Sequence, residues 1–264
     1  NIIQFHSLDN TADQLAFWDA RAPLGLYAGT RDRIAKELEM RAIERHLTGA
    51  VRLLDMGCGD GETARYLADR YGVRVDAVDF SAEMLQNQQP LARTAPGTVR
   101  YYRCELTAWS VGGYDAVYTE RCVINLPDWP AQLRAIRHLI NLARPGGRYV
   151  MVEASEDGLR NVNGMRALVG LPPVTPPSHN RYLRDAELYE AANSWFSLGL
   201  TAPHNDTPWT FFACKLVNPP FTIPLGTERS PVPLTFLCIP FTNDPYQDGE
   251  GANGQTLFSN DPLT

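Results

Sequence analysis

Apolar residues recur with two spacings along the first two thirds of the chain, one typical of strands and one typical of helices. One short apolar run of strand length begins at Leu53, and three more occupy residues 73–78, 114–118 and 148–153. Between the last two runs, residues 131–143 show helical spacing, with apolar side chains at Leu133, Ile136, Leu139, Ile140 and Ala143. This alternation of strands and helices predicts an α/β fold with a mostly parallel sheet.

Two later segments extend the predicted sheet. Residues 209–217 are expected to form a sixth strand, and residues 234–239 a seventh strand antiparallel to it. Residues 254–258 compete for the seventh position, and the sequence does not decide between the two. Prolines at 219, 220, 224, 231, 233, 240, 245 and 262 exclude long helices from this part of the chain. We therefore expect a doubly wound sheet of seven strands.

The 264 residues are interpreted as one domain with additions. Residues 1–50 form an N-terminal helical cap, in which residues 32–46 have the clearest helical pattern. Residues 51–217 form the core, and residues 155–200 within it are an insertion after the fifth strand. This insertion contains a helix near residues 159–168, a proline-rich tract at 172–177 and a core helix at 185–196. Residues 218–264 form a proline-rich tail.

A glycine-rich loop follows the first strand directly. Glycines stand at 57, 59 and 61, where they let the backbone turn tightly and approach a ligand without a Cβ. The second strand ends at Asp79, about twenty residues on, where a carboxylate can accept hydrogen bonds from ribose hydroxyls. Ligands of doubly wound sheets bind outside the carboxyl ends of the strands. The pattern therefore predicts a cofactor that contains adenosine.

The acidic character of the loop indicates which cofactor this is. A dinucleotide motif needs a third glycine at position 62, which is Glu62 here. A carboxylate in the first helical turn would repel a pyrophosphate, and no Gly-Lys-Ser/Thr sequence follows for a P-loop. Asp55, Asp60 and Glu62 instead suit a ligand with positive charge. S-adenosylmethionine carries a sulfonium and an ammonium and no phosphate, so it is the predicted cofactor.

Several motifs together resemble the class I S-adenosylmethionine-dependent methyltransferases, whose fold is Rossmann-like. They are the segment 53–61, Asp79-Phe80-Ser81, and the helix, Arg-Pro-Gly-Gly turn and strand that ends at Glu153. The resemblance covers about residues 27–217. Within the superfamily, residues 29–32, 120–126 and 179–180 resemble a subgroup met in bacterial polysaccharide gene clusters.

This resemblance implies a set of cofactor contacts. Asp55 anchors the loop and the ammonium group, Gly57 and Gly59 approach the ligand, and Cys58 contributes backbone. Asp79 binds the ribose. Phe80 either stacks near the adenine or belongs to the core. Glu105 stands where related families have an acidic residue that contacts the adenine amino group, and Leu106 offers a backbone amide to the ring. Glu120 either contacts the cofactor tail or substrate or pairs with Arg121. Thr30 and Arg31 are candidates for the cofactor carboxylate.

Composition and charge narrow the partners. The net charge of −6 and the absence of a basic run argue against nucleic acid. Five cysteines contain no C-x-x-C pair, so we interpret them as reduced thiols of a cytoplasmic protein. No apolar run approaches the ~18 residues of a membrane helix. No cluster has the spacing of metal ligands, so no metal is expected. A small-molecule acceptor is the expected partner.

Two residues are candidates for a general base. His179 has a reference pKa of ~6.5 and lies in the insertion expected over the substrate, although packing beside the proline tract is the alternative. Glu153, at the end of the fifth strand, is the second candidate. We expect methyl transfer to a hydroxyl, with a sugar or glycan precursor favoured. Methylation of an amine or carboxylate, a non-catalytic cofactor-binding module and aminopropyl transfer are the alternatives, the last disfavoured because no paired aspartates follow the fourth strand.

Overall fold

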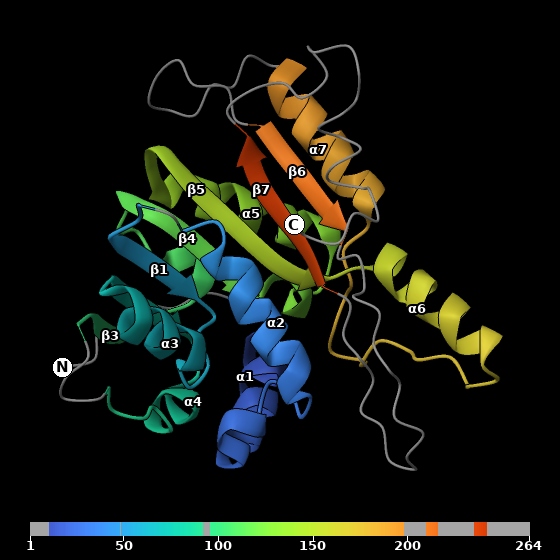
Figure 1. Ribbon diagram of the computed structural model, residues 1–264, viewed down its shortest axis with the longest axis horizontal. Helices are drawn as coiled ribbons and strands as arrows, with labels where there is room; N and C mark the ends of the chain where they lie inside the picture. Colours follow the sequence, from blue (N-terminus) through green and yellow to red (C-terminus); the bar gives the residue numbers. More distant parts are fainter. Residues whose placement is uncertain (1–10, 48, 92–95, 198–209, 216–234, 242–264) are drawn as a thin grey trace.

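One mixed sheet organises the protein. The computed structural model describes residues 11–47, 49–91, 96–197, 210–215 and 235–241. Within these residues the strand order is β3-β2-β1-β4-β5-β7-β6 (Figure 1). The first five strands run parallel, and β7 is antiparallel to both β5 and β6. The strands are β1 (Arg52–Met56), β2 (Arg74–Asp79), β3 (Thr98–Arg103), β4 (Tyr114–Glu120), β5 (Ala143–Ala154), β6 (Thr210–Lys215) and β7 (Thr235–Phe241). The expected parallel α/β core is confirmed.

Helices cover both faces of this sheet and precede it as the N-terminal segment. Side-chain oxygens of Asp32, Ser81, Asp128 and Ser155 accept backbone N–H groups at the starts of α2, α4, α5 and α6, as N-caps do. The helical elements are α1 (Thr11–Arg21), η1 (Ala22–Tyr27), α2 (Arg33–Glu44), α3 (Glu62–Tyr71), α4 (Ala82–Gln86), η2 (Leu106–Ala108), η3 (Val123–Asn125), α5 (Trp129–Leu142), α6 (Glu156–Leu168) and α7 (Asp185–Ser197).

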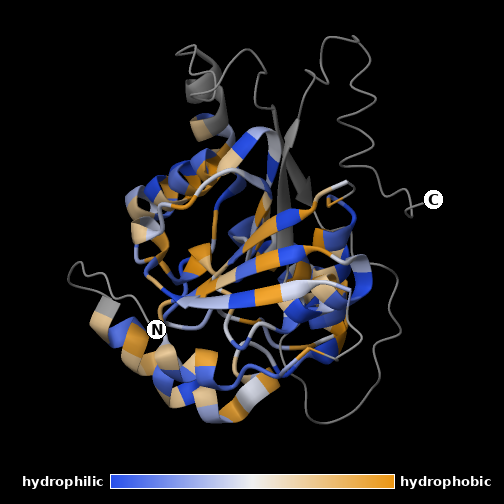
Figure 2. Ribbon diagram, turned by 90° about the vertical axis from the view of Figure 1, so that its left-hand side faces the viewer, coloured by the Kyte–Doolittle hydropathy of each residue, from blue (hydrophilic) through white to orange (hydrophobic). Residues whose placement is uncertain are grey.

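The apolar core has two halves, one on each face of the sheet. Leu53 packs in the half that includes Ile43 of α2 and Leu67 of α3. The next residue, Leu54, packs in the other half with Leu139 of α5. Successive strand residues point to opposite faces, so consecutive leucines serve both cores. Figure 2 shows hydrophobic residues recurring along the central strands between the helices.

The start of β5 differs from the prediction. We expected the helix to reach residue 143 and the strand to begin at residue 148. In the structure α5 ends at Leu142, and Ala143 already pairs with Tyr114 of β4. The pairing register then shifts between Tyr114 and Ala116, so the Pro-Gly-Gly turn lies within an irregular strand. Backbone pairing with a neighbouring strand decides this boundary, and the local pattern does not report it.

The segment after β5 contains helices close to the predicted ones. The helix expected near residues 159–168 is α6, and the one expected at 185–196 is α7. The proline tract between them has no regular secondary structure. The candidate seventh strand at 234–239 overlaps β7, whereas residues 254–258 lie outside the described residues. In the part of the chain described here, no helix is long and apolar enough to cross a membrane.

Candidate functional site

A cavity of about 440 Å³ lies where three parallel strands end. Met56, Asp79 and Glu120 are the last residues of β1, β2 and β4, and all three line it. The N-terminal helices supply a further wall, with Trp18 from α1 and Lys36 from α2. In the sheet order β1 lies between β2 and β4. Ligands of open α/β sheets bind at such a reversal of strand order, outside the carboxyl ends.

The glycine loop forms the floor of the cavity. The N–H groups of Gly57 and Cys58 both donate to the carbonyl oxygen of Val78, at 2.8 and 3.0 Å, which fixes the loop against β2. Gly57 has φ +78°, and a Cβ there would come within 2.7 Å of Cys122 Cβ. Gly59 has φ +58°. Only glycine adopts such backbone angles at no steric cost, so the sequence motif is explained by the geometry.

Asp79 connects the loop to the cavity. Its Oδ2 accepts the N–H of Gly59 at 2.8 Å, and its Oδ1 accepts the N–H of Ser81 at 2.9 Å. Burial raises the pKa of Asp79 to about 6, although these backbone donors favour the charged form. A carboxylate offers about four lone-pair directions, so roughly two remain for a ligand. The side chain can therefore hold the loop and still accept two ribose hydroxyls.

Asp55 is a buried acid in the wall of the cavity. The residue lines the cavity and is 2 % exposed. Burial and the nearby charge of Glu120 raise the pKa of Asp55 to about 8, although Lys36 and a hydrogen bond from the Tyr118 hydroxyl favour the charged form. A cation that reached this side chain would favour its charged form further. The ammonium group of S-adenosylmethionine is a cation of this kind, so the site fits this cofactor.

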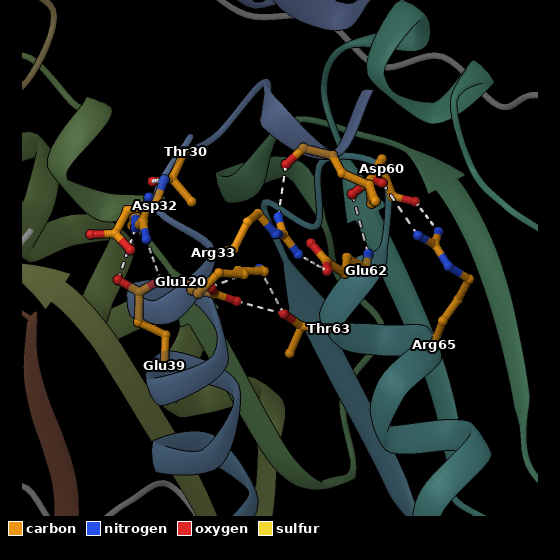
Figure 3. Close-up of polar contacts among 12 residues, drawn as sticks. Thr30, Asp32, Arg33, Glu39, Asp60, Glu62, Thr63, Arg65 and Glu120 are labelled. Atoms are coloured by element: carbon orange, nitrogen blue, oxygen red, sulfur yellow. Dashed lines mark hydrogen bonds and ion pairs between the residues drawn. The ribbon is translucent and has the colours of Figure 1, made fainter. Parts of the chain in front are cut away.

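Glu120 is held by the N-terminal segment. Lys36 Nζ donates to Glu120 Oε1 at 2.7 Å and to Thr63 Oγ1 at 2.8 Å. The Thr63 hydroxyl in turn donates to Glu120 Oε2 at 2.6 Å (Figure 3). Burial opposes the charge on Lys36, but Glu120 outweighs it and raises the lysine pKa. Arg121, at φ +51°, pairs with Glu39 of α2. Glu120 and Arg121 therefore do not pair with each other as the alternative prediction had it. Each forms an ion pair with α2, Glu120 with Lys36 and Arg121 with Glu39.

The remaining predicted cofactor contacts also line the cavity. Phe80 follows β2 directly, Glu105 and Leu106 come from the segment after β3, and Cys58 belongs to the glycine loop. Glu105 accepts a hydrogen bond from Thr107 at 2.7 Å. Burial raises the pKa of the Cys58 thiol well above its usual range, so the thiol stays neutral, as expected for a residue that contributes backbone. Thr30 lines the cavity as well, whereas Arg31 does not.

The two predicted bases do not line the cavity. Glu153 is completely buried, and its carboxylate accepts the N–H groups of Cys122, Val123 and Ile124 at 3.0, 2.9 and 3.3 Å. Its oxygens are engaged in shaping the loop after β4, which corrects the expectation of a base. The ring of His179 packs against Phe17, with centroids 4.0 Å apart. Burial lowers the pKa of His179, and its role as a base stays a prediction.

Comparison with known proteins identifies the family. Residues 53–147 match the family model of a methyltransferase domain, and this segment contains the glycine loop and Asp79. The chain belongs to the class I S-adenosylmethionine-dependent methyltransferases. The resemblance to class I methyltransferases that the sequence motifs indicated is confirmed. The narrower resemblance to enzymes of polysaccharide gene clusters stays a prediction.

Individual relatives of this methyltransferase are distant. It is 35 % identical over 133 residues to a trans-aconitate 2-methyltransferase of Azoarcus sp. strain BH72, covering 49 % of this chain and 48 % of that one. It is 32 % identical to a malonyl-[acyl-carrier protein] O-methyltransferase of Enterobacter lignolyticus, covering 68 % and 62 %. The chain thus spans less than two thirds of each relative. A solved structure titled "DhpI-SAM-HEP complex" superposes on this chain with a TM-score of 0.54 at 21 % sequence identity. The superposition covers 90 % of this chain and all of that one, and it supports the fold.

The sequence analysis of this methyltransferase missed several cavity residues. Gln14 and Trp18 line the cavity from α1, Lys36 from α2, Thr63 from α3 and Asn125 from η3. Lys36 had one available signal, because it is a lysine on a helix that buries Ala35, Glu39 and Met40 beside it. Asn125 belongs to the segment 120–126 on which part of the resemblance rests. Gln14, Trp18 and Thr63 carry no local signal, because their place depends on how α1 and α3 pack on the sheet.

Proposed function

We propose that this protein transfers the methyl group of S-adenosylmethionine to a small polar acceptor, with a hydroxyl of a sugar or glycan precursor as the favoured target. The observation that carries the proposal is the pair of carboxylates on neighbouring strand ends. Asp79 retains lone pairs for ribose hydroxyls, and Asp55 is a buried acid whose charged form an ammonium would favour. Both line the same cavity as the glycine loop.

The roles of the residues follow from this binding mode. S-adenosylmethionine supplies an electrophilic methyl group on a positively charged sulfur. We assign the ribose to Asp79, the ammonium to Asp55, and the adenine to the surface formed by Phe80, Glu105 and Leu106. Gly57, Cys58 and Gly59 contribute backbone, and Glu120 maintains the shape of the cavity through Lys36. Much of the rate of such a displacement comes from positioning the two reactants.

Carboxylate methylation is the second candidate, and two observations favour it. Arg134 lines the cavity, and among the described residues it forms no ion pair, unlike Lys36 and Arg121. An unpaired guanidinium suits an anionic acceptor. The relative named trans-aconitate 2-methyltransferase is named for a carboxylic acid. The favoured sugar hydroxyl is supported by Trp18 in the wall, because aromatic rings pack on sugar faces.

The test is formation of S-adenosylhomocysteine from S-adenosylmethionine across an acceptor panel. The panel contains sugars and nucleotide sugars, small carboxylic acids including trans-aconitate, and primary amines. Turnover above the acceptor-free rate with a sugar supports the favoured target, and turnover with an acid supports the second candidate. Binding of the cofactor without turnover on any class would indicate a non-catalytic module. A double variant of Asp79 and Asp55 to Ala is the control, since it should lose both binding and turnover.

A further inference from the structure

The short helix η1 buries its small apolar residues and exposes its large ones. Ala22 and Ala28, at its start and just after its end, are buried with Met84 of α4. Four large apolar residues of η1 and the start of α2 are 40 %, 43 %, 51 % and 73 % exposed, and we call them the apolar rim: Leu24, Leu26, Tyr27 and Ile34. Large apolar residues are usually buried, so this order reverses the usual pattern. Exposed apolar residues that gather in this way mark an interaction site.

Polar contacts on both sides of η1 hold the apolar rim in place. Asn87, just after α4, donates its Nδ2 to the carbonyl oxygen of Ala22. Arg33 of α2 donates to the carbonyl oxygen of Leu26 at 3.0 Å and forms an ion pair with Glu62 of α3. These contacts fix the backbone of η1 between α3 and α4. The large side chains therefore have no freedom to turn inward, and their exposure is a property of the fold.

The apolar rim stands at the mouth of the cavity. Leu26 belongs to the rim and also lines the cavity, together with its neighbour Gly25. Gly25 has φ +55° and ψ −127°, so it interrupts the helical backbone between Leu24 and Leu26. Because Leu26 is both exposed and part of the cavity wall, it lies where the cavity opens to solvent. Any surface that seats on the rim faces this opening.

The charges beside the apolar rim favour an anionic partner. Residues 21–36 contain four basic side chains and one acidic side chain, whereas the whole chain has 24 basic and 30 acidic ones. Two of the four basic side chains pair with acids of α3 and β4. Arg31 is exposed and forms no ion pair among the described residues, and the single acid, Asp32, is engaged as the N-cap of α2. Apolar side chains next to basic ones are typical of segments that bind anionic lipid.

The size of the apolar rim favours a lipid surface over a protein. A stable protein interface takes about 20–30 residues a side and a complementary shape. Four apolar residues fall well short of this number. A bilayer needs no matching shape, and aromatic and basic side chains settle at its boundary with water. Tyr27 and Arg33 form such a combination, with the guanidinium carbon 5.9 Å from the ring centroid.

We propose that the apolar rim docks this protein on an anionic lipid bilayer, with the mouth of the cavity facing the membrane. For its consequence this inference rests on the proposed function and deepens it. The acceptor hydroxyl then belongs to the polar head of an amphiphile held in the bilayer, such as a lipid-linked sugar. The docking itself requires only the rim and the basic side chain beside it.

Flotation with lipid vesicles tests the docking without knowledge of the acceptor. The full chain is mixed with vesicles of phosphatidylcholine alone, or of phosphatidylcholine and phosphatidylglycerol in equal parts. The wild type should float with the mixed vesicles and less with phosphatidylcholine alone. Leu24→Ser/Tyr27→Ser should lower the partition coefficient on mixed vesicles at least about tenfold, because two apolar side chains no longer enter the bilayer. Arg31→Gln should lower it about fivefold, on mixed vesicles only.

Leu168→Ser/Val169→Ser is the matched control. These two residues at the end of α6 are 87 % and 59 % exposed and do not line the cavity, and α6 stands apart from α1 and α2 (Figure 1). The control should float as the wild type does. Calorimetry with S-adenosylmethionine shows that Leu24→Ser/Tyr27→Ser is folded and keeps the cofactor site.

Three results would overturn the docking. They are a wild type that does not float with mixed vesicles, an equal loss of flotation in the control, and a wild-type dimer in sedimentation velocity that Leu24→Ser/Tyr27→Ser abolishes. The dimer would assign the apolar rim to a second copy of the chain. A wild type that floats but does not bind S-adenosylmethionine would instead overturn the proposed function, so the two failures are distinguishable.

Discussion

Replacing Asp79 with Asn tests the cofactor site most directly, because the side chain keeps its size and loses one oxygen. In the folded protein its two oxygens accept the N–H groups of Ser81 and Gly59, at 2.9 and 2.8 Å. In Asp79→Asn one of these donors has to face an amide NH₂ group. The loop at Gly59 and the ribose site therefore change together.

The size of the effect follows from the hydrogen bonds that remain for the ligand. About two lone-pair directions of Asp79 are free, and a hydrogen bond to a charged group contributes roughly 1.5–3 kcal/mol. Loss of one such bond lowers affinity by about tenfold to somewhat over a hundredfold. Since the pKa of Asp79 is raised to about 6, the wild-type side chain is ionised at pH 7.5, where the measurement is made. We expect at least about tenfold weaker binding in Asp79→Asn, and in Asp79→Ala a further loss.

Titration calorimetry with S-adenosylmethionine measures this effect, and thermal unfolding shows that the variants fold. Asp76→Asn is the matched control, because Asp76 lies on the same strand but accepts from Tyr114 at 2.9 Å and does not line the cavity. The control should bind as the wild type does. Unchanged affinity in folded Asp79→Asn and Asp79→Ala would refute the assignment of the ribose site.

Four further predictions address the loop, the buried acids and the candidate base. Gly59→Val should abolish cofactor binding in calorimetry with only a moderate fall in Tm; retained binding would make the loop a structural turn alone. Glu153→Gln should lose roughly 2 kcal/mol of stability, because an amide NH₂ meets a backbone N–H. Burial raises the pKa of Glu153 to about 7, so protonated Glu153 stabilises the folded protein at low pH. This stabilisation is lost as the pH rises through about 7. Denaturant unfolding from pH 5 to 8 should show a steeper loss of stability in the wild type than in the variant, in which Asp55 and Asp79 still titrate. Cofactor affinity should rise with pH toward about 8, where Asp55 ionises, and Asp55→Asn should remove the rise. His179→Ala should lower turnover about a hundredfold or more with cofactor affinity unchanged if His179 is the base; full turnover would assign the proton to solvent.

The parts of the site that the sequence predicted lie within single strand–loop segments. Asp55, Gly57 and Gly59 belong to one such segment, and Asp79 ends the next strand of the same unit. Their positions relative to one another depend on local backbone geometry, which the glycine spacing and the strand length already specify. Parallel strands also bring their carboxyl ends to one edge, so the cavity-lining positions of Glu105 and Glu120 could be anticipated.

Segments distant in sequence were the source of the differences. Glu153 ends a strand near the cavity, as predicted, but the loop after β4 folds over it and supplies three N–H groups. Nothing near position 153 reports those donors. His179 was expected over the substrate, and its ring packs against Phe17 of α1, a contact that nothing near position 179 reports.

By itself, then, the sequence determined the α/β core, the glycine loop and the kind of cofactor, and it predicted Asp79 as the ribose ligand. These follow from apolar periodicity, from the backbone freedom of glycine and from charge, all of which act within short stretches of chain. The tertiary structure decided that Lys36 reaches Glu120, that Glu153 supports a loop, and that the apolar rim stays exposed beside the cavity. Burial and hydrogen-bond partners come from residues far apart along the chain, and they become defined only when the cap and the loops pack on the sheet.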